Sequence, residues 1–186
     1  MREFVESRFT APRPDCPNPE RWHAPDDQST EVEVTALVAA MVTALQPDFV
    51  LETGTCRGST TEAIGRALRA NGQGKLVSLE VDPECVAFAR RRCVGLPVCI
   101  LATSSMDYIP SCPIDFAFFD SLASLRALEF VRYARWMHDR TVVGFHDTGP
   151  QHTVRERLKH LEEEGMLVSP LYLPTPRGVM FARVRT

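Results

Sequence analysis

The sequence predicts an α/β protein with a doubly wound, mostly parallel seven-stranded sheet and a C-terminal antiparallel hairpin. From residue 30 to about residue 165, short apolar runs alternate with helical segments, which is typical of parallel strands because each crossover needs a long connection. After the first such run, glycines at 54 and 58 indicate a tight turn into a helix. The last two apolar runs, 167–173 and 178–185, are separated only by a proline-containing turn, which favours a hairpin.

Length and composition limit the classes of function. The 186 residues are enough for one domain with its own core and leave no room for a second. Lys and Arg number 21 against 24 Asp and Glu, so there is no basic surplus for binding nucleic acid or anionic lipid. No uninterrupted apolar run approaches the length of a membrane span. We therefore expect neither nucleic acid nor a membrane as a partner.

The cysteines and the N-terminus indicate a cytoplasmic protein. The six cysteines form no Cys-x-x-Cys pair and no zinc-type spacing, and several lie inside apolar runs. We expect them to be core side chains rather than disulfides. Residues 1–10 carry four charged side chains, unlike a secretory signal peptide.

Residues 1–28 are expected to form an irregular N-terminal arm, and residues 29–186 a single domain. Five of the fourteen prolines lie in the arm, where they exclude a regular helix or strand. We expect the arm to be draped on the core or to act as a lid over the substrate. After it, Thr30 and Glu33 have the spacing of a capping box, and apolar residues follow at steps of three and four up to Leu45. This pattern predicts an amphipathic helix that packs on the sheet or on a second subunit.

The segment 49–61 predicts a strand, a glycine loop and a helix, the corner that binds nucleotide-like cofactors. Glycine allows positive φ and lets a ligand lie against the backbone, while the first amides of the helix point to the same place. The Gly54-x-x-x-Gly58 spacing is neither the dinucleotide pattern nor the Walker loop. Glu52 would repel a phosphate and attract a cation, which favours S-adenosylmethionine (SAM) over a nicotinamide cofactor.

The next predicted strand, 75–81, brings a second acidic side chain to the same edge of the sheet. Asp82 followed by Pro83 is well placed to cap the next helix, whereas Glu80 has no such structural role at the tip of a buried strand. In nucleotide-binding folds an acid at this tip accepts hydrogen bonds from ribose hydroxyls. Glu80 is therefore a candidate ribose ligand.

Together the two segments resemble the class I SAM-dependent methyltransferases. Residues 52–59, Glu-x-Gly-x-x-x-Gly-Ser, are similar to the first motif of that family, and residues 79–82, Leu-Glu-Val-Asp, to the second. The resemblance covers about residues 30–185 and implies a Rossmann-like fold in which the first, fourth and fifth strands are adjacent. It also implies that SAM is bound by Glu52, Gly54, Gly58, Ser59 and Glu80.

A third segment is expected to contact the adenine of SAM. After a strand predicted at 98–101, residues 103–110 resemble the Gly-x-Ser-x-Asp-x-x-Pro stretch of small O-methyltransferases, except that the glycine is missing. By this resemblance Ser105 and Met106 flank the adenine. The alternative is a polar loop with one helical turn.

Acidic residues end the next two predicted strands. The strand 114–119 ends on Asp120, and after a helix predicted at 125–137 the strand 141–145 ends on His146 and Asp147. Both strand ends resemble those that bind magnesium in catechol-type and antibiotic-sugar O-methyltransferases. The resemblance implies a divalent cation at Asp120, His146 and Asp147, although imidazole suits manganese, iron or zinc better than magnesium. The structural alternative is that Asp120 caps the next helix and Asp147 begins a loop.

The resemblance implies O-methylation of a small-molecule hydroxyl in secondary metabolism. The hydroxyl must lose its proton, either to a base or through a cation that lowers its pKa. Asp120 and His146 are the candidate catalytic residues, with Asp120 also close to the cofactor and His146 either a metal ligand or the general base. Because the chain has no cap domain, the arm, the loops or a partner subunit must complete the pocket, and we expect a homodimer.

Two other functions are compatible with the same residues. One is a metal-dependent hydroxylase or another oxidative tailoring protein on this fold. The other is a SAM-binding module without catalytic activity.

Overall fold

The computed structural model of the chain describes residues 9, 12–13 and 15–185. The predicted arm, residues 1–28, is therefore seen only in part. Residues 1–8, 10–11 and 14 of the arm, and residue 186 of the predicted domain, lie outside the described residues.

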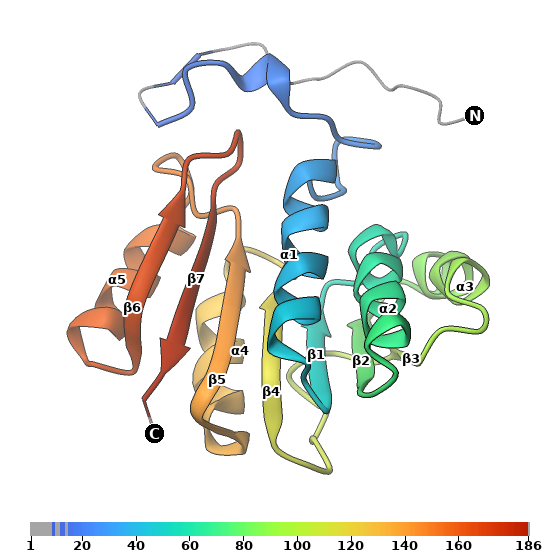
Figure 1. The fold of residues 1–186 in the computed structure, drawn as a ribbon. Helices are drawn as coiled ribbons and strands as arrows, with labels where there is room; N and C mark the ends of the chain where they lie inside the picture. The colour runs from blue at the N-terminus through green and yellow to red at the C-terminus, as the bar shows by residue number, and fades with distance from the viewer. Residues whose placement is uncertain (1–8, 10–11, 14, 186) are drawn as a thin grey trace.

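Among the described residues, seven strands form one sheet in the order β3-β2-β1-β4-β5-β7-β6 (Figure 1). Strands β1 to β5 are parallel, whereas β7 runs antiparallel to both of its neighbours, β5 and β6. The predicted fold class, including the C-terminal hairpin, is confirmed. The strands are β1 (Phe49–Thr53), β2 (Lys75–Glu80), β3 (Val98–Ala102), β4 (Ile114–Phe119), β5 (Met137–His146), β6 (Leu167–Leu173) and β7 (Val179–Val184).

The described helices cover both faces of this sheet (Figure 1). One face carries α1 (Val32–Leu45), α2 (Ser59–Asn71) and α3 (Pro83–Arg92), and the other carries α4 (Arg126–Tyr133) and α5 (Val154–Glu163). Short 3-10 turns, η1 (Pro19–Arg21) and η2 (Ala134–Trp136), precede α1 and follow α4. None of the described helices has the length and apolar character that spanning a membrane requires.

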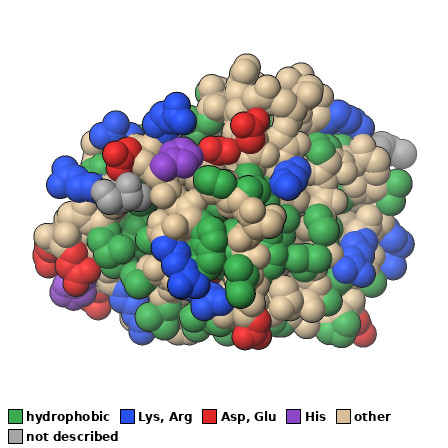
Figure 2. All heavy atoms as spheres, turned by 90° about the horizontal axis from the view of Figure 1, so that it is seen from below, with side chains coloured by type: hydrophobic (Ala, Val, Ile, Leu, Met, Phe, Trp, Pro, Cys, Tyr) green, Lys and Arg blue, Asp and Glu red, His purple; other side chains and the backbone are tan. Residues whose placement is uncertain are grey.

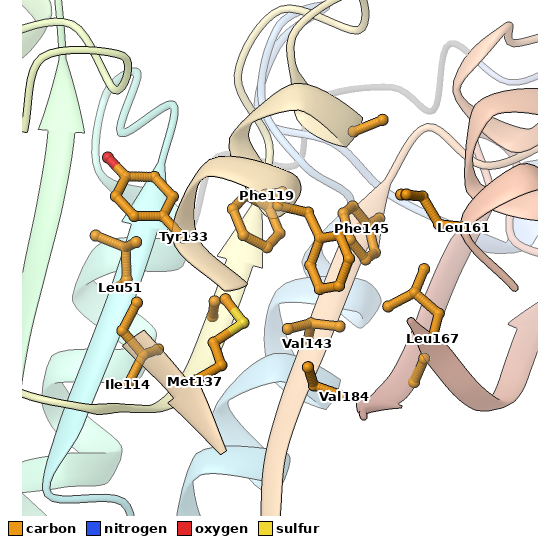
Figure 3. Close-up of a cluster of buried hydrophobic side chains, with 14 of the residues drawn as sticks. Leu51, Ile114, Phe119, Tyr133, Met137, Val143, Phe145, Leu161, Leu167 and Val184 are labelled. Atoms are coloured by element: carbon orange, nitrogen blue, oxygen red, sulfur yellow. The ribbon is translucent and has the colours of Figure 1, made fainter. Parts of the chain in front are cut away.

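Alternating side chains of the central strands build two cores. Phe118 points to the face of α1 and α2, and Phe119 to the face of α4 and α5. On the second face Phe119 and Phe145 stack with ring centroids 5.0 Å apart, and Tyr133 of α4 lies beside Phe119 on the side of Leu51 (Figure 3).

The lower end of the molecule in Figure 1, where β1 to β5 begin, carries no single charged region. Figure 2 shows Lys and Arg side chains scattered there among hydrophobic and acidic ones. This distribution agrees with the balanced composition of 21 basic and 24 acidic residues.

The predicted cap at Asp82 is confirmed, and a second local signal, Gly72, ends the preceding helix. Gly72 ends α2 in the left-handed conformation with φ 73°. Asp82 caps α3, where its carboxylate accepts hydrogen bonds from the backbone N–H groups of Glu84 (2.8 Å) and Cys85 (3.2 Å). Both signals depend on neighbouring residues alone.

The helix predicted at 125–137 is too long. α4 ends at Tyr133, and Met137 already begins β5. Met137 is buried opposite Ile114 of β4, and the side chain of His138 pairs with Asp115. Pairing with the neighbouring strand and burial therefore outweigh the helical pattern.

The capping box predicted at Thr30 and Glu33 is wrong. No side chain caps the N-terminus of α1, which begins after Glu31. Thr30 instead donates its hydroxyl to Asp120, and Glu33 accepts hydrogen bonds from His23. Tertiary partners thus use both side chains that a capping box needs.

Candidate functional site

The carboxyl ends of β1, β4 and β5 meet at the upper edge of the sheet in Figure 1, beneath the segment that leads into α1. The strand order reverses between β1 and β4, which is the usual ligand position in open α/β sheets. Thr53 pairs with Phe119, and Phe119 pairs with Phe145, so the residues that follow these three are neighbours. The predicted convergence of the three strand ends is therefore present.

The glycine loop is packed too tightly for another residue at position 54. Gly54 has φ +85°, and a Cβ atom there would lie 2.4 Å from the carbonyl oxygen of Asp120. Gly58 has φ +77° at the N-terminus of α2, and its backbone approaches Ala89. The backbone itself requires both glycines, and Gly54 fixes the loop against the end of β4.

Glu52 lies beneath the loop and is 1% exposed. Its Oε2 accepts hydrogen bonds from the hydroxyls of Thr61 and Ser78, both at 2.5 Å. Burial raises the pKa of Glu52 to about 7; the two hydrogen bonds oppose this rise, and the carboxylates of Asp120 and Glu80 add to it. Glu52 is not among the residues that line the neighbouring pocket, so its contact with a cofactor stays a prediction.

A pocket of about 30 Å³ lies between the glycine loop and the end of the arm. Its walls are residues 28–30 of the segment before α1, residues 54–57 of the loop, Ser59 and Thr60 of α2, and Asp120. The space holds about two water molecules. Within the described part of the chain, the buried hydroxyl of Ser59 has no hydrogen-bond partner. An unpartnered buried hydroxyl in a pocket wall leaves a hydrogen-bonding position for a water molecule or a ligand in the pocket.

Glu80 connects the second predicted motif to the glycine loop. Its Oε2 accepts a hydrogen bond from the backbone N–H of Cys56 at 2.7 Å, and its Oε1 accepts from the N–H groups of Val81 and Asp82. Cys56 has φ +48°, a left-handed turn that is uncommon outside glycine. The two predicted cofactor motifs are therefore in direct contact.

Ser105 and Met106 lie farther from the pocket walls. Ser105 is buried and donates its hydroxyl to Glu129 of α4. Glu129 also accepts hydrogen bonds from the hydroxyls of Thr53 (2.9 Å) and Ser121 (2.7 Å). Met106 is half-buried in the same loop as Ser105. Neither residue lines the pocket, and their contact with adenine stays a prediction.

The three residues of the predicted metal site lie together. One ligand atom from each of Asp120, His146 and Asp147 falls within 4.8 Å of the others. Nδ1 of the fully buried His146 is 3.0 Å from Oδ1 of Asp120, and its Nε2 is 2.6 Å from Oε2 of Glu31. Burial alone would lower the pKa of His146, but Asp120 and Glu31 raise it to about 9. The imidazole is therefore protonated at neutral pH and donates to both carboxylates.

Two arginines neutralise the carboxylates of this cluster. Nη2 of Arg126 lies 3.0 Å from Oδ1 of Asp120 and 2.8 Å from Oδ2 of Asp147. Arg177 forms a bidentate pair with Asp147, in which Nε lies 2.6 Å from Oδ1 and Nη2 lies 3.1 Å from Oδ2. Burial would raise the pKa of Asp147, but His146 and the two arginines hold it well below its usual value. Because every ligand atom already has a partner, this donor set does not fit a divalent cation in the observed arrangement.

Glu31, Arg126 and Arg177 are site residues that the sequence motifs do not reveal. Glu31 and Arg177 come from a helix start and a hairpin turn, and nothing in the sequence relates either to the strand ends. A signal did exist for Arg126, because Arg126 and Glu129 are oppositely charged residues three apart in a predicted helix. That spacing places both on one face, turned to a common polar environment.

The sequence matches a known family over this region. A family model described as a methyltransferase domain matches residues 51–148, which include the glycine loop, Glu80 and the ends of β4 and β5. The chain belongs to this methyltransferase family. No curated protein matched the sequence.

Solved methyltransferase structures have the same fold as this methyltransferase. An O-methyltransferase from Streptomyces achromogenes involved in tomaymycin synthesis, in complex with SAM, is 19% identical with a TM-score of 0.73, over 86% of this chain and 83% of that chain. A methyltransferase from Podospora anserina bound to S-adenosylhomocysteine (SAH) is 17% identical with a TM-score of 0.74, over 88% and 83%. An O-methyltransferase from Bacillus cereus in complex with SAH is 16% identical with a TM-score of 0.74, over 86% and 84%. At these identities the likeness establishes the fold.

Proposed function

We propose that this methyltransferase transfers a methyl group from SAM to the hydroxyl of a small molecule. The observation that carries the proposal is that the unpartnered hydroxyl of Ser59 and the carboxylate of Asp120 line the same pocket. A free hydroxyl at the N-terminus of a helix suits the carboxylate of SAM, and an aspartate suits an acceptor hydroxyl. The relatives from S. achromogenes and B. cereus, O-methyltransferases in complex with SAM and SAH, support the same choice.

The cofactor, when bound, supplies a methyl group on a positively charged sulfur. The backbone amides of the first turn of α2 are available to its amino-acid part, whereas Gly54, Cys56 and Gly58 of the loop already donate within the protein. Glu80 is proposed to bind its ribose. Glu52 supports the loop from beneath through Thr61. The residues proposed to contact the cofactor are Gly54, Gly58, Ser59, Glu80, Ser105, Met106 and Asp120, and Glu52 is proposed to contribute indirectly by holding the loop and α2 in place.

Asp120 is the proposed catalytic residue. Burial would raise its pKa, but His146 and Arg126 lower it, so the carboxylate is ionised at neutral pH. The hydroxyl of Thr30 donates to its Oδ2 at 2.5 Å, which supports hydroxyl binding at this oxygen. An acceptor hydroxyl in the same place would be oriented by Asp120 and would pass its proton to it as the new C–O bond forms. Because a carboxylate of low pKa is a weak base, we expect an acidic acceptor such as a phenol.

His146 is proposed to act through Asp120. Its two N–H groups hold the carboxylates of Asp120 and Glu31, which supports a role in orienting Asp120 rather than in accepting a proton. We expect His146→Ala to abolish turnover while SAM binding is retained. An active variant would exclude this role.

We further propose that the N-terminal arm is a lid. Residues 28–30 form one wall of a pocket of about 30 Å³, which is far too small for SAM. Thr30 and Glu31 hold this segment on Asp120 and His146. We therefore expect this segment to move when SAM binds.

The proposal includes a homodimer in the cytoplasm. α1 exposes Val32 (41%) and Leu45 (40%), and Glu33 is the only charged residue in this helix, which supports a second subunit at its outer face. All six cysteines are free, which supports a reducing compartment. Light scattering that gives a fully active monomer would contradict the dimer.

Calorimetry and a product assay test the proposed reaction. The wild-type chain should bind SAM and form SAH together with a methylated product when it is supplied with a panel of phenols and other hydroxyl compounds. Asp120→Asn should keep SAM affinity and lose turnover. Oxidised product without SAM would support the oxidative alternative, and SAM binding without turnover on the whole panel would support a binding module.

A further inference from the structure

Asp120 and Asp147 end two neighbouring parallel strands, and a guanidinium lies between them. Arg126 places one nitrogen, Nη2, 3.0 Å from Oδ1 of Asp120 and 2.8 Å from Oδ2 of Asp147. The Arg126 side chain is only 4% exposed. The positively charged side chain of Arg126 therefore bridges the two strand ends.

The remaining nitrogens of Arg126 anchor it to the same strand ends. Nε and Nη2 donate to the carbonyl oxygen of Ser121 at 2.9 Å and 2.7 Å, and Nη1 donates to the carbonyl oxygen of His146 at 2.5 Å. These carbonyls belong to the residue after Asp120 and the residue before Asp147. The guanidinium is thus fixed by the backbone that presents the two carboxylates, and it stays charged at any working pH.

The cluster is electrically complete without an added ion. Asp120 and Asp147 face the guanidinium groups of Arg126 and Arg177, and Glu31 faces His146, so each carboxylate has a basic partner. Both nitrogens of His146 face carboxylate oxygens, so neither presents a lone pair outward. A divalent cation would have to displace a buried guanidinium and leave it without its partners, which is costly in a buried site.

We propose that Arg126 takes the place of a divalent cation, so that the cluster of Asp120, His146 and Asp147 binds no metal ion. Resting on the proposed function, the inference adds that methyl transfer needs no added metal, because Arg126 supplies the positive charge that fixes Asp120. Arg126 is then a positioning residue. In this role Arg126 acts through its positive charge as well as through the fold. The effect of that charge on metal binding can be measured without an activity assay.

The first test is Mn²⁺ binding by electron paramagnetic resonance on the full wild-type chain, with and without SAH. We expect no stoichiometric binding at micromolar Mn²⁺. The same methyl-transfer rate is expected with a chelator and with added Mg²⁺. A stoichiometric Mn²⁺ site that is lost in Asp147→Asn would overturn the proposal. If no acceptor is methylated, the proposed function fails, but the Mn²⁺ measurement still decides this inference.

The second test removes the Arg126 charge from between the carboxylates of Asp120 and Asp147. Arg126→Met removes the charge at similar length and leaves the two carboxylates without it, so Mn²⁺ affinity should rise by about tenfold or more over wild type. Arg132→Met is the matched control, since Arg132 lies in the same helix and donates to the carbonyl of Tyr108 outside this cluster. The control should bind Mn²⁺ no better than wild type.

Circular dichroism shows which variants fold. A folded Arg126→Met variant with wild-type Mn²⁺ affinity would overturn the assignment to Arg126. If Arg126→Met does not fold, Arg126→Lys replaces it, because the ammonium keeps the charge but cannot reach both carbonyls and both carboxylates. It should still exclude Mn²⁺, and a Lys variant that binds Mn²⁺ as tightly as a typical carboxylate site would contradict exclusion by charge.

Discussion

His146 and Glu31 are hydrogen-bonded across 115 residues of sequence, with 2.6 Å between Nε2 and Oε2. Both side chains are fully buried. The pair joins the end of β5 to the segment that leads into α1, and Glu31 also accepts a hydrogen bond from the backbone N–H of Arg177 at 3.0 Å. The position of the segment before α1 therefore depends on charges at the end of β5.

Glu31→Gln removes one of the two carboxylates that hold the charge of His146. Breaking a buried ion pair from one side should lower the free energy of unfolding by about 3–5 kcal/mol, as measured by urea denaturation. Glu33→Gln is the matched control, because Glu33 pairs with His23 at an exposed site, where a pair contributes about 0–1 kcal/mol. Equal losses in the two variants would contradict a special role for Glu31.

The stability of the fold should depend on the ionisation of His146. Burial lowers its pKa, but Asp120 and Glu31 raise it to about 9, above the usual 6.5. The folded state holds this proton more tightly than the unfolded state, so the stabilisation is complete below about pH 6.5 and is lost as the pH rises through about 9. Urea unfolding across this range measures the loss, and His146→Asn should flatten it. A wild-type stability that rises over the same range would be the opposite result.

Glu52 is expected to act through the fold rather than as a charge facing SAM. Burial raises its pKa to about 7 from the usual 4.5, so its carboxyl is most stabilising below about pH 4.5, and this contribution is lost as the pH rises through about 7. Glu52→Gln should remove that dependence and keep SAM affinity within about threefold, since the side chain does not line the pocket. A tenfold loss of affinity at unchanged stability would instead support the charge role predicted from the sequence.

Gly54→Ala should disrupt the glycine loop. The new Cβ would meet the carbonyl oxygen of Asp120 at 2.4 Å, and φ is +85°. We expect SAM binding to be lost in calorimetry and the free energy of unfolding to fall by more than in Gly72→Ala. The control has a similar φ, +73°, with no atom within 4 Å of the new Cβ, and should show only the backbone strain of about 1–2 kcal/mol. Similar losses would mean that the close approach to β4 is unimportant.

Ser59→Ala should weaken SAM binding without lowering the stability of the fold. Its hydroxyl is buried without a partner, so removing it should leave the free energy of unfolding unchanged or slightly raised. SAM affinity should fall by about tenfold, because the proposed partner is the cofactor. Thr61→Val is the contrasting control, since its hydroxyl donates to Glu52, and its loss should cost about 1–3 kcal/mol of stability. A destabilised Ser59→Ala variant with normal SAM affinity would argue against the assignment.

The sequence was sufficient for features that neighbouring residues determine. The glycine loop and the cap at Asp82 follow from local turns, and the mostly parallel sheet follows from the alternation of elements. The adjacency of the first, fourth and fifth strands comes from the resemblance to the methyltransferase family. The partners of the strand ends could not be predicted in the same way. Thr30 has the sequence pattern of a helix cap, yet it bonds Asp120 ninety residues away, and only the folded chain brings the two together. The same holds for Arg177, whose turn gives no indication that it faces Asp147.

The limits of the helix after Asp120 illustrate a second cause. Residues 134–137 fit a helical pattern, but Met137 is more favourably buried opposite Ile114 than at the end of α4. Competition between two acceptable local structures is decided by tertiary packing. Sequence patterns alone cannot weigh that packing.

Glu129 has a consequence for redesigning this enzyme. It accepts hydroxyl hydrogen bonds from Thr53 at the end of β1, Ser105 after β3 and Ser121 after β4. Exchanging one of these segments to change the choice of methyl acceptor therefore also changes the hydrogen bonding of Glu129, which the other two segments share. A graft that keeps a hydroxyl at position 105 leaves the neighbouring loops in register, whereas one that omits it leaves a buried acceptor short by one donor, at a cost of about 1–3 kcal/mol. Because Glu129 links the three segments by hydrogen bonds, loop exchanges in this chain should be planned around position 129.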